Sequence, residues 1–203
     1  VQSRLLVPRS RYDEAKQILK AAYDGFADKW GHFDEPTCSM GPVVSKKQME
    51  RVKSYIDLGV EEGATLMSGG NLRPDMGTGW FIEPTCFVDV TNDMRIAQEE
   101  IFGPVLVVIP FDDDEDAIRI ANDSVYGLSG GVWSGDRARA INIAKRVQTG
   151  TIGVNGGTPI NGDLPFGGYK QSGIGRAWGV EGIEEYLETK AFHWGGLKLG
   201  SRA

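Results

Sequence analysis

The chain contains one segment whose sequence strongly restricts its environment. Residues 104–111, PVLVVIPF, are apolar without interruption and rich in β-branched side chains. A strand with one face in water alternates apolar and polar residues, whereas a strand covered on both faces does not. We therefore predict a strand inside a mostly parallel sheet, with helices packed on both faces.

Strand-like and helix-like segments alternate on either side of this run. Further strands are expected within residues 3–8, 64–70, 80–90, 128–134 and 151–155, and helices within 10–30, 45–62, 112–124 and 136–150. Ser10 and Ser45 stand where the first two helices would begin and are N-cap candidates, and Gly150 stands where the last would end. This alternation predicts an α/β fold.

Two of the expected helices have an apolar stripe. The stripe comprises Tyr12, Ala15, Ile18, Leu19, Ala22 and Phe26 in the first helix, and Val52, Ile56 and Val60 in the second. The helix within 112–124 begins with a run of carboxylates, which the helix dipole favours at that end. A calcium loop is the competing interpretation, but the spacing and glycine of an EF-hand are absent.

Composition excludes several classes of function. The net charge is −6 and the 22 basic residues are scattered, so no footprint for nucleic acid is expected. No apolar run approaches the roughly 20 residues that span a bilayer, and the first residues lack the apolar core of a signal peptide. A cytoplasmic protein is expected. Cys38 and Cys86 have no neighbouring ligand at metal-site spacing, so no metal is expected.

The glycine-rich stretch 165–179, PFGGYKQSGIGRAWG, is the obvious place to look for a phosphate-binding loop. A Walker A loop fails because Ile174 stands where lysine is required, and a dinucleotide fingerprint fails because Trp178 occupies the third glycine position. On composition alone, the favoured interpretation is a surface loop whose glycines adopt unusual backbone angles.

A nucleophile is equally hard to find within the chain. No Gly-x-Ser-x-Gly elbow occurs, and His32 and His193 have no partner suggested by sequence. Cys38 lies in a polar loop, and Cys86 lies in an apolar strand where a thiol usually behaves as a small buried side chain. A catalytic cysteine is therefore not expected among these residues.

The order of five motifs is more informative than any one of them. They are EEIFGPV at 99–105, NDSVYGL at 122–128, GTIGVN at 150–155, PFGGYKQSGIGR at 165–176 and GIEEYLETK at 182–190. Together they resemble the aldehyde dehydrogenase superfamily, in the C-terminal part of its catalytic domain. The resemblance runs from the start of the chain to about His193.

The resemblance implies an activity. Similar enzymes oxidise aldehydes with NAD or NADP: a cysteine thiolate attacks the aldehyde, hydride passes to the nicotinamide, and a glutamate-activated water hydrolyses the thioester. In the family the cysteine lies shortly before the pair seen here as Ser3 and Arg4. The nucleophile, the general base and the dinucleotide-binding domain are thus expected upstream of Val1. We expect no catalytic residue in this chain, and no activity from it alone.

The resemblance also implies a cofactor contact. The second glutamate of EEIFGP maps to Glu100, which would accept hydrogen bonds from the nicotinamide ribose, and Phe102 would pack against the nicotinamide end. An ionised carboxylate only accepts hydrogen bonds, so it can take both hydroxyls of a ribose diol. Glu99 is expected to be structural or solvent-facing, because neighbours in an extended segment point to opposite sides.

Substrate and subunit contacts follow from the same resemblance. Asn155 would end a strand near the active site, and Ile160 and Phe166 would line the aldehyde tunnel, although plain core packing is an equal alternative for Phe166. The chain would divide into a catalytic-domain part, 1–188, and an oligomerisation strand and tail, 189–203. Ala177 departs from the family pattern, which commonly has glutamate there.

Two other functions remain open from the sequence. One is a non-catalytic oligomerisation or binding module that retains the fold. The other, less favoured, is a related reductase acting on acyl phosphates. For a part of a larger enzyme, the expected partners are the remainder of that enzyme, an aldehyde substrate and further copies of itself. The isolated chain is then expected to be less stable than its length suggests.

Overall fold

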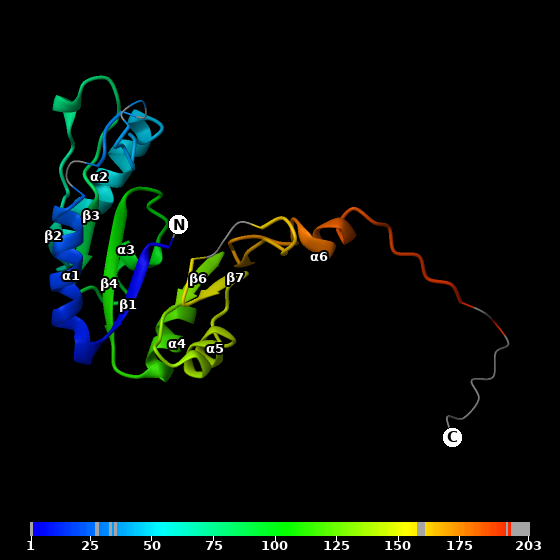
Figure 1. The fold of residues 1–203 in the computed structure, drawn as a ribbon. Coiled ribbons are helices and arrows are strands. Elements are labelled where there is room, and N and C mark those ends of the chain that lie inside the picture. Colours follow the sequence, from blue (N-terminus) through cyan, green and yellow to red (C-terminus); the bar gives the residue numbers. More distant parts are fainter. Residues whose placement is uncertain are drawn as a thin grey trace.

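The structure is a computed structural model, and it describes residues 2–26, 29–32, 34, 36–157, 161–193 and 195 (Figure 1). The strands are β1 Arg4–Pro8, β2 Thr65–Ser68, β3 Thr85–Val88, β4 Val105–Phe111, β5 Tyr126–Gly127, β6 Ser129–Val132, β7 Thr151–Val154 and β8 Tyr169–Lys170. The α-helices are α1 Tyr12–Asp24, α2 Lys46–Glu61, α3 Arg95–Gln98, α4 Asp114–Asn122, α5 Arg137–Ala144 and α6 Gly179–Glu184. Short 3-10 turns occur at Arg9–Arg11 and Pro74–Met76.

Strand β4 lies inside the main sheet, as its uninterrupted apolar sequence predicts. The strand order is β1-β4-β3-β2, and β4 pairs in parallel with both β1 and β3. Strand β2 is an antiparallel edge strand on β3. Two smaller sheets follow along the chain: β6 pairs in parallel with β7, and β5 pairs antiparallel with β8.

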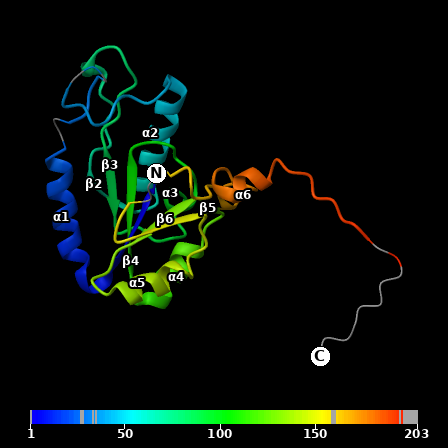
Figure 2. The ribbon, with the colours of Figure 1, turned by 45° about the vertical axis from the view of Figure 1, so that its right-hand side comes forward.

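Both faces of the main sheet are covered by helices. On one face Tyr12 of α1 packs with Cys86 and Val108. On the other face Val52 and Ile56 of α2 join a larger cluster that contains β4 residues and reaches α4. Figure 2 shows α1 on one side of the strands, with α2 and α3 on the other. The predicted α/β fold with a mostly parallel sheet is therefore confirmed.

Two helix boundaries differ from the sequence predictions. Ser10 is not the cap of α1, because it lies inside the 3-10 turn after β1, and Arg11 occupies the N-cap without a side-chain hydrogen bond. Helix α5 ends at Ala144, well before Gly150. Gly150 serves another purpose: a Cβ there would lie 1.6 Å from the carbonyl oxygen of Gly167, so only glycine permits this backbone crossing.

The apolar stripe of α1 is narrower than predicted. Ala15, Leu19 and Tyr23 pack beside Tyr12, whereas Ile18 is 61% exposed. The packed side chains lie on the face of α1 that meets β3 and β4, and Ile18 lies off that face. In α2, likewise, Val52 and Ile56 are buried, but Val60 is 52% exposed.

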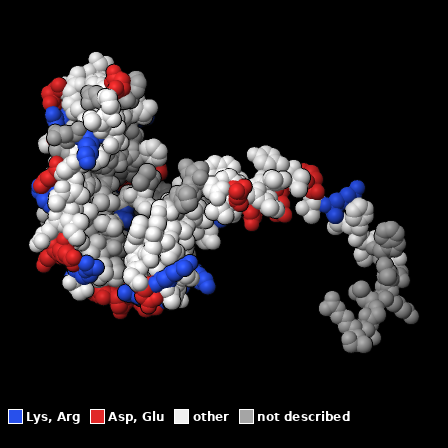
Figure 3. Space-filling model, viewed as in Figure 1, with Lys and Arg blue, Asp and Glu red and all other residues white. Residues whose placement is uncertain are grey.

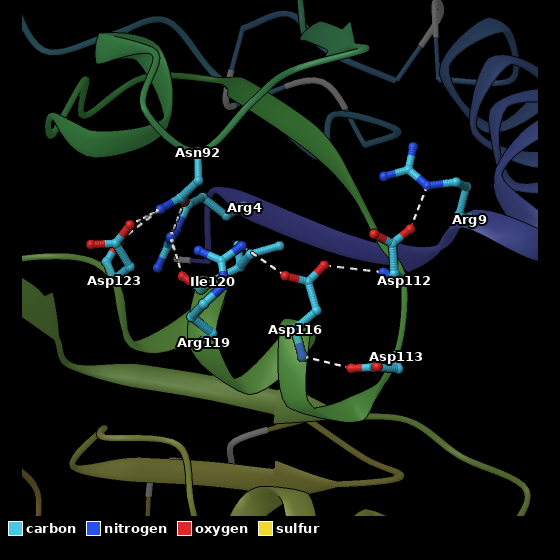
Figure 4. A network of polar contacts seen from close by, with 9 residues as sticks. All are labelled: Arg4, Arg9, Asn92, Asp112, Asp113, Asp116, Arg119, Ile120 and Asp123. Atoms are coloured by element: carbon cyan, nitrogen blue, oxygen red, sulfur yellow. Dashed lines mark hydrogen bonds and ion pairs between the residues drawn. The ribbon is translucent and has the colours of Figure 1, made fainter.

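Two other predicted helix starts are confirmed. The Ser45 hydroxyl accepts a hydrogen bond from the Gln48 amide at 3.2 Å, and the Asp113 carboxylate accepts one from the Asp116 amide at 2.9 Å (Figure 4). The carboxylates after Asp113 pair with arginines: Asp114 with Arg139, Glu115 with Arg146 and Asp116 with Arg119. The acidic run at 112–116 therefore opens α4 and binds it to α5.

A half-buried arginine joins β1 to the end of α4. The Arg4 guanidinium of β1 donates to the Asn92 side chain at 2.7 Å and to the Ile120 and Ala121 carbonyls at 3.0 Å (Figure 4). Burial lowers the pKa of Arg4, and the charge of Asp123 opposes that shift. The network fixes the end of α4 against the edge of the main sheet.

The surface carries charges of both signs. Acidic and basic side chains are interspersed over the main body on the face shown in Figure 3. Within the part of the chain that the structure describes, no helix is both long enough and apolar enough to cross a membrane.

Candidate cofactor and substrate site

The predicted cofactor loop, residues 99–103, connects α3 to β4. Its first residue, Glu99, has extended backbone angles of φ −100° and ψ 149°. The Glu99 carboxylate accepts hydrogen bonds from the Arg95 guanidinium at 2.8 and 3.2 Å and from the Tyr55 hydroxyl at 2.6 Å. These bonds, with Arg95 the larger cause, lower the pKa of Glu99 to about 2. Glu99 therefore has a structural role.

Glu100 follows with its side chain free. The residue is exposed, and none of the described residues forms a hydrogen bond or ion pair with its carboxylate. Its backbone is held instead: the Arg51 guanidinium of α2 donates to the Glu100 carbonyl at 2.5 Å. The carboxylate is thus available to a ligand while its backbone is restrained.

Phe102 lies on the same loop in a strained conformation. Its φ is 58°, in the left-handed region, and the residue is 78% exposed. The side-chain amide nitrogen of Gln48 in α2 donates to the Ile101 carbonyl at 3.0 Å and to the Phe102 carbonyl at 2.9 Å. A large apolar ring held outward in a left-handed turn costs free energy unless its surroundings enforce it. The structure therefore places Glu100 and Phe102 together on a loop bound to α2.

The next residue explains how closely the loop approaches α2. A Cβ added to Gly103 would lie 2.4 Å from the nearest methyl carbon of Val52, which is fully buried. At the other end of the loop, the side-chain amide nitrogen of Gln98 donates to the backbone carbonyls of Asn92 and Asp123 at 2.7 and 2.9 Å. Both ends of the loop are thus fixed by long-range contacts.

Sequence reasoning missed the α2 side chains that hold this loop. Gln48, Arg51 and Tyr55 stand at positions i, i+3 and i+7, so they share one face of the helix. That face borders the apolar stripe of Val52 and Ile56. Polar residues at this spacing beside an apolar stripe are the sequence signal that could have predicted a polar contact between α2 and a neighbouring loop.

Phe166 occupies a different region, in the glycine-rich stretch. Its ring packs against Trp178 with the centroids 5.3 Å apart, and its backbone exchanges two 2.7 Å hydrogen bonds with Ala177. The residue is 36% exposed, so plain core packing does not describe it. It lines an open depression of about 350 Å³, together with Leu128, Ile174, Arg176 and Tyr186.

The glycines of this stretch have two distinct uses. Gly173 and Gly175 have φ values of 154° and 72°, as the sequence interpretation expects. Gly167 and Gly168 instead allow close approach, because an added Cβ would lie 2.6 Å from the Gly175 carbonyl oxygen and 2.5 Å from Ser172. The stretch is a tightly folded segment rather than a loose loop.

Asn155 uses its amide within the protein. Its side-chain oxygen accepts from the Ser134 amide at 2.8 Å, and its side-chain nitrogen donates to the Ser134 carbonyl at 2.8 Å. With φ 51°, Asn155 thus fixes the ends of β6 and β7 together. A contact with substrate stays a prediction for Asn155, and Ile160 lies outside the described residues.

The two cysteines are engaged in the fold. Cys86 is fully buried beneath α1, and burial raises the pKa of its thiol to about 11. The Cys38 thiol contacts the carbonyls of Gly31 and Met40 at 3.4 and 3.3 Å. A buried thiol with a raised pKa is a poor nucleophile.

Residues 1–192 match the sequence model of the aldehyde dehydrogenase family. With the α/β fold and the motif order described above, the chain belongs to this family. The chain spans about 39% of the length of the curated relatives that it matches.

Two kinds of relatives show the extent of the similarity. A putative aldehyde dehydrogenase of Staphylococcus haemolyticus is 48% identical over 93% of the chain. Betaine aldehyde dehydrogenase of Staphylococcus aureus, solved with NAD+, is 43% identical with a TM-score of 0.88, over 93% of this chain and 37% of that one. An aldehyde dehydrogenase of Mycobacterium tuberculosis, also with NAD+, is 50% identical with a TM-score of 0.83, over 91% and 38%.

Proposed function

We propose that this chain provides the nicotinamide-ribose end of the cofactor site, and part of the aldehyde site, in an NAD-dependent aldehyde dehydrogenase. The observation that carries the proposal is the loop of Glu100 and Phe102, where both side chains are exposed and the backbone is held by Gln48 and Arg51. NAD is favoured because the similar enzymes described above were solved with NAD+.

The residues of the loop fit such a cofactor chemically. An ionised carboxylate at Glu100 can accept from both hydroxyls of a vicinal diol, and the exposed ring of Phe102 offers an apolar surface beside it. The cofactor, when bound, accepts the hydride removed from the aldehyde. The contribution of this chain is to hold the ribose so that the geometry of hydride transfer is reached. NADP has the same nicotinamide ribose, so the loop does not distinguish the two.

Phe166 and Ile160 are proposed to line the aldehyde site, with Asn155 near its edge. The pairing of Phe166 with Trp178 supports an apolar wall at this position. Because Cys86 is buried and its thiol pKa is raised, we propose that the nucleophilic cysteine belongs to another part of the enzyme. The purified 203-residue chain should then produce no NADH from NAD and an aldehyde. Turnover by this chain, free of longer enzyme, would contradict the assignment.

The cofactor contact is tested with Glu100→Gln in the protein expressed from its complete coding sequence. The amide keeps the size of the side chain but removes its charge. We expect KM for NAD to rise by roughly tenfold or more, since a hydrogen bond to a charged group contributes roughly 1.5–3 kcal/mol. Glu61→Gln, an exposed residue at the end of α2, is the matched control. An unchanged KM and kcat in Glu100→Gln would refute the contact.

We also propose that residues 179–193, which include α6, contact a second copy of the chain. Exposed apolar side chains concentrate there: Val180, Ile183, Tyr186, Leu187 and Phe192 are each at least 64% exposed. Figure 1 shows this segment extending away from the sheet. Removal of 189–203 should lower the molecular mass measured by light scattering to that of a smaller assembly. An unchanged assembly would favour a different interface.

A further inference from the structure

The Tyr55 side chain of α2 is connected to both residues of the Glu99–Glu100 pair. Its hydroxyl donates to the Glu99 carboxylate at 2.6 Å and accepts from the Arg51 guanidinium at 3.2 Å. The same Arg51 nitrogen donates to the Glu100 carbonyl at 2.5 Å. One phenol therefore fixes the side chain of Glu99 directly and the backbone of Glu100 through Arg51.

We propose that Tyr55 and Glu99 are positioning residues that direct the Glu100 carboxylate toward the cofactor. This inference rests on the function proposed above for Glu100. It assigns a role to Glu99, which the sequence treats as structural or solvent-facing, and to Tyr55, which no sequence motif identifies.

The backbone geometry explains how Glu99 can control its neighbour. Successive side chains in an extended segment point to opposite sides, and Glu99 has extended backbone angles. Because the Glu99 carboxylate is bonded to Tyr55 of α2 and Arg95 of α3, the Glu100 side chain is turned to the opposite side of the chain. Freeing Glu99 would let the peptide between the two residues rotate, and Glu100 would sample other directions.

The arrangement differs from an ordinary surface ion pair. The Arg95–Glu99 bridge alone is an exposed i,i+4 pair, a type that contributes little. Tyr55, however, is only 8% exposed and belongs to the main core cluster, so its hydroxyl is a fixed anchor. The Arg51 guanidinium also lies over the Tyr55 ring, 4.9 Å from its centroid. The ring therefore orients the group that holds Glu100.

The test uses Tyr55→Phe and Glu99→Gln, singly and together, in the protein expressed from its complete coding sequence. Phenylalanine retains the buried ring and removes only the hydroxyl. The matched control is Glu50→Gln, which removes an exposed i,i+4 partner of Lys46 on the same helix. Two quantities are measured: KM for NAD and for the aldehyde, and amide hydrogen exchange of residues 99–103 and 105–111.

Positioning predicts a selective effect. Each single variant should raise KM for NAD about tenfold, the change expected when one hydrogen bond to a charged group is lost. KM for the aldehyde should stay constant, and the double variant should resemble Tyr55→Phe, because Glu99→Gln weakens the contact that Tyr55→Phe removes. Exchange in 99–103 should become roughly fivefold faster while the β4 amides keep their protection. Glu50→Gln should change neither quantity.

Three outcomes overturn the inference in different ways. An NAD KM within twofold of wild type in both single variants shows that the pair does not position Glu100. Faster exchange across β4 as well as the loop shows a general loss of stability. If Glu100→Gln also has the same KM for NAD as wild type, the proposed cofactor contact itself has failed. The exchange data would then still report whether Tyr55 and Glu99 hold the loop.

Discussion

Gly103→Ala tests how closely the predicted cofactor loop, residues 99–103, must approach α2. The added Cβ would lie 2.4 and 2.8 Å from the two methyl carbons of Val52 and 3.2 Å from its Cβ. Carbon atoms prefer separations of roughly 3.5–4.0 Å, so a shift of about 1 Å is needed. Val52 is fully buried and cannot move into solvent. Overpacking of this kind costs about 1–3 kcal/mol in the free energy of unfolding.

The assay is urea unfolding followed by far-ultraviolet circular dichroism. Val52→Ala supplies the decisive comparison, because it removes both clashing methyl groups and leaves only the contact at 3.2 Å. Val52→Ala alone should destabilise the protein by about 2 kcal/mol. Gly103→Ala should then cost less in that background than in wild type, by about 1 kcal/mol or more. Additive effects, or a Gly103→Ala variant as stable as wild type, would refute the predicted clash.

Three further predictions concern single groups. The folded-state pKa of Glu99 is about 2 against an ordinary 4.5, so its stabilising contribution is present above about pH 4.5 and is lost toward pH 2. Glu99→Gln should therefore make the unfolding free energy depend less on pH between about pH 2 and 4.5. In native protein at pH near 8, iodoacetamide should label Cys38 before Cys86, whose buried thiol has a pKa of about 11; equal labelling rates would contradict that burial. Ser45→Ala should lower the unfolding free energy by about 1 kcal/mol through loss of the α2 cap, whereas Ser10→Ala should not, since Ser10 caps no helix.

Regular segments could be predicted because their signals are local. The apolar run in β4 indicates burial on both faces, and Ser45 and Asp113 are residues that prefer helix N-caps. Predictions failed at Ser10, where the local path of the backbone decided the outcome, and at Gly150, where a residue distant in sequence did. Ser10 has the chemistry of a cap, but the chain enters a 3-10 turn after Pro8. Gly150 resembles a helix terminator, but its lack of a side chain serves a crossing with Gly167.

In the candidate site, too, the sequence predicts some residues and not others. Motif order singles out Glu100 and Phe102 as candidate cofactor contacts, but it does not say what holds them. Gln48, Arg51 and Tyr55 come from a helix more than forty residues earlier, and their hydrogen bonds to the loop span separations of 44 to 54 residues. Such contacts have no local signature, because they exist only once α2 and the loop are packed on the same face of the sheet.

By itself the sequence determined the α/β class, the central position of β4 and the membership of the aldehyde dehydrogenase family, since hydrophobic pattern and motif order are properties of the chain. Only the tertiary structure decided that the Glu99 carboxylate bonds to Tyr55 and Arg95, that the Glu100 carboxylate is left without such bonds among the described residues and that Phe102 has a left-handed backbone. The physical reason is that a loop conformation follows from whatever satisfies its backbone and buried polar groups. Here those partners are supplied by α2.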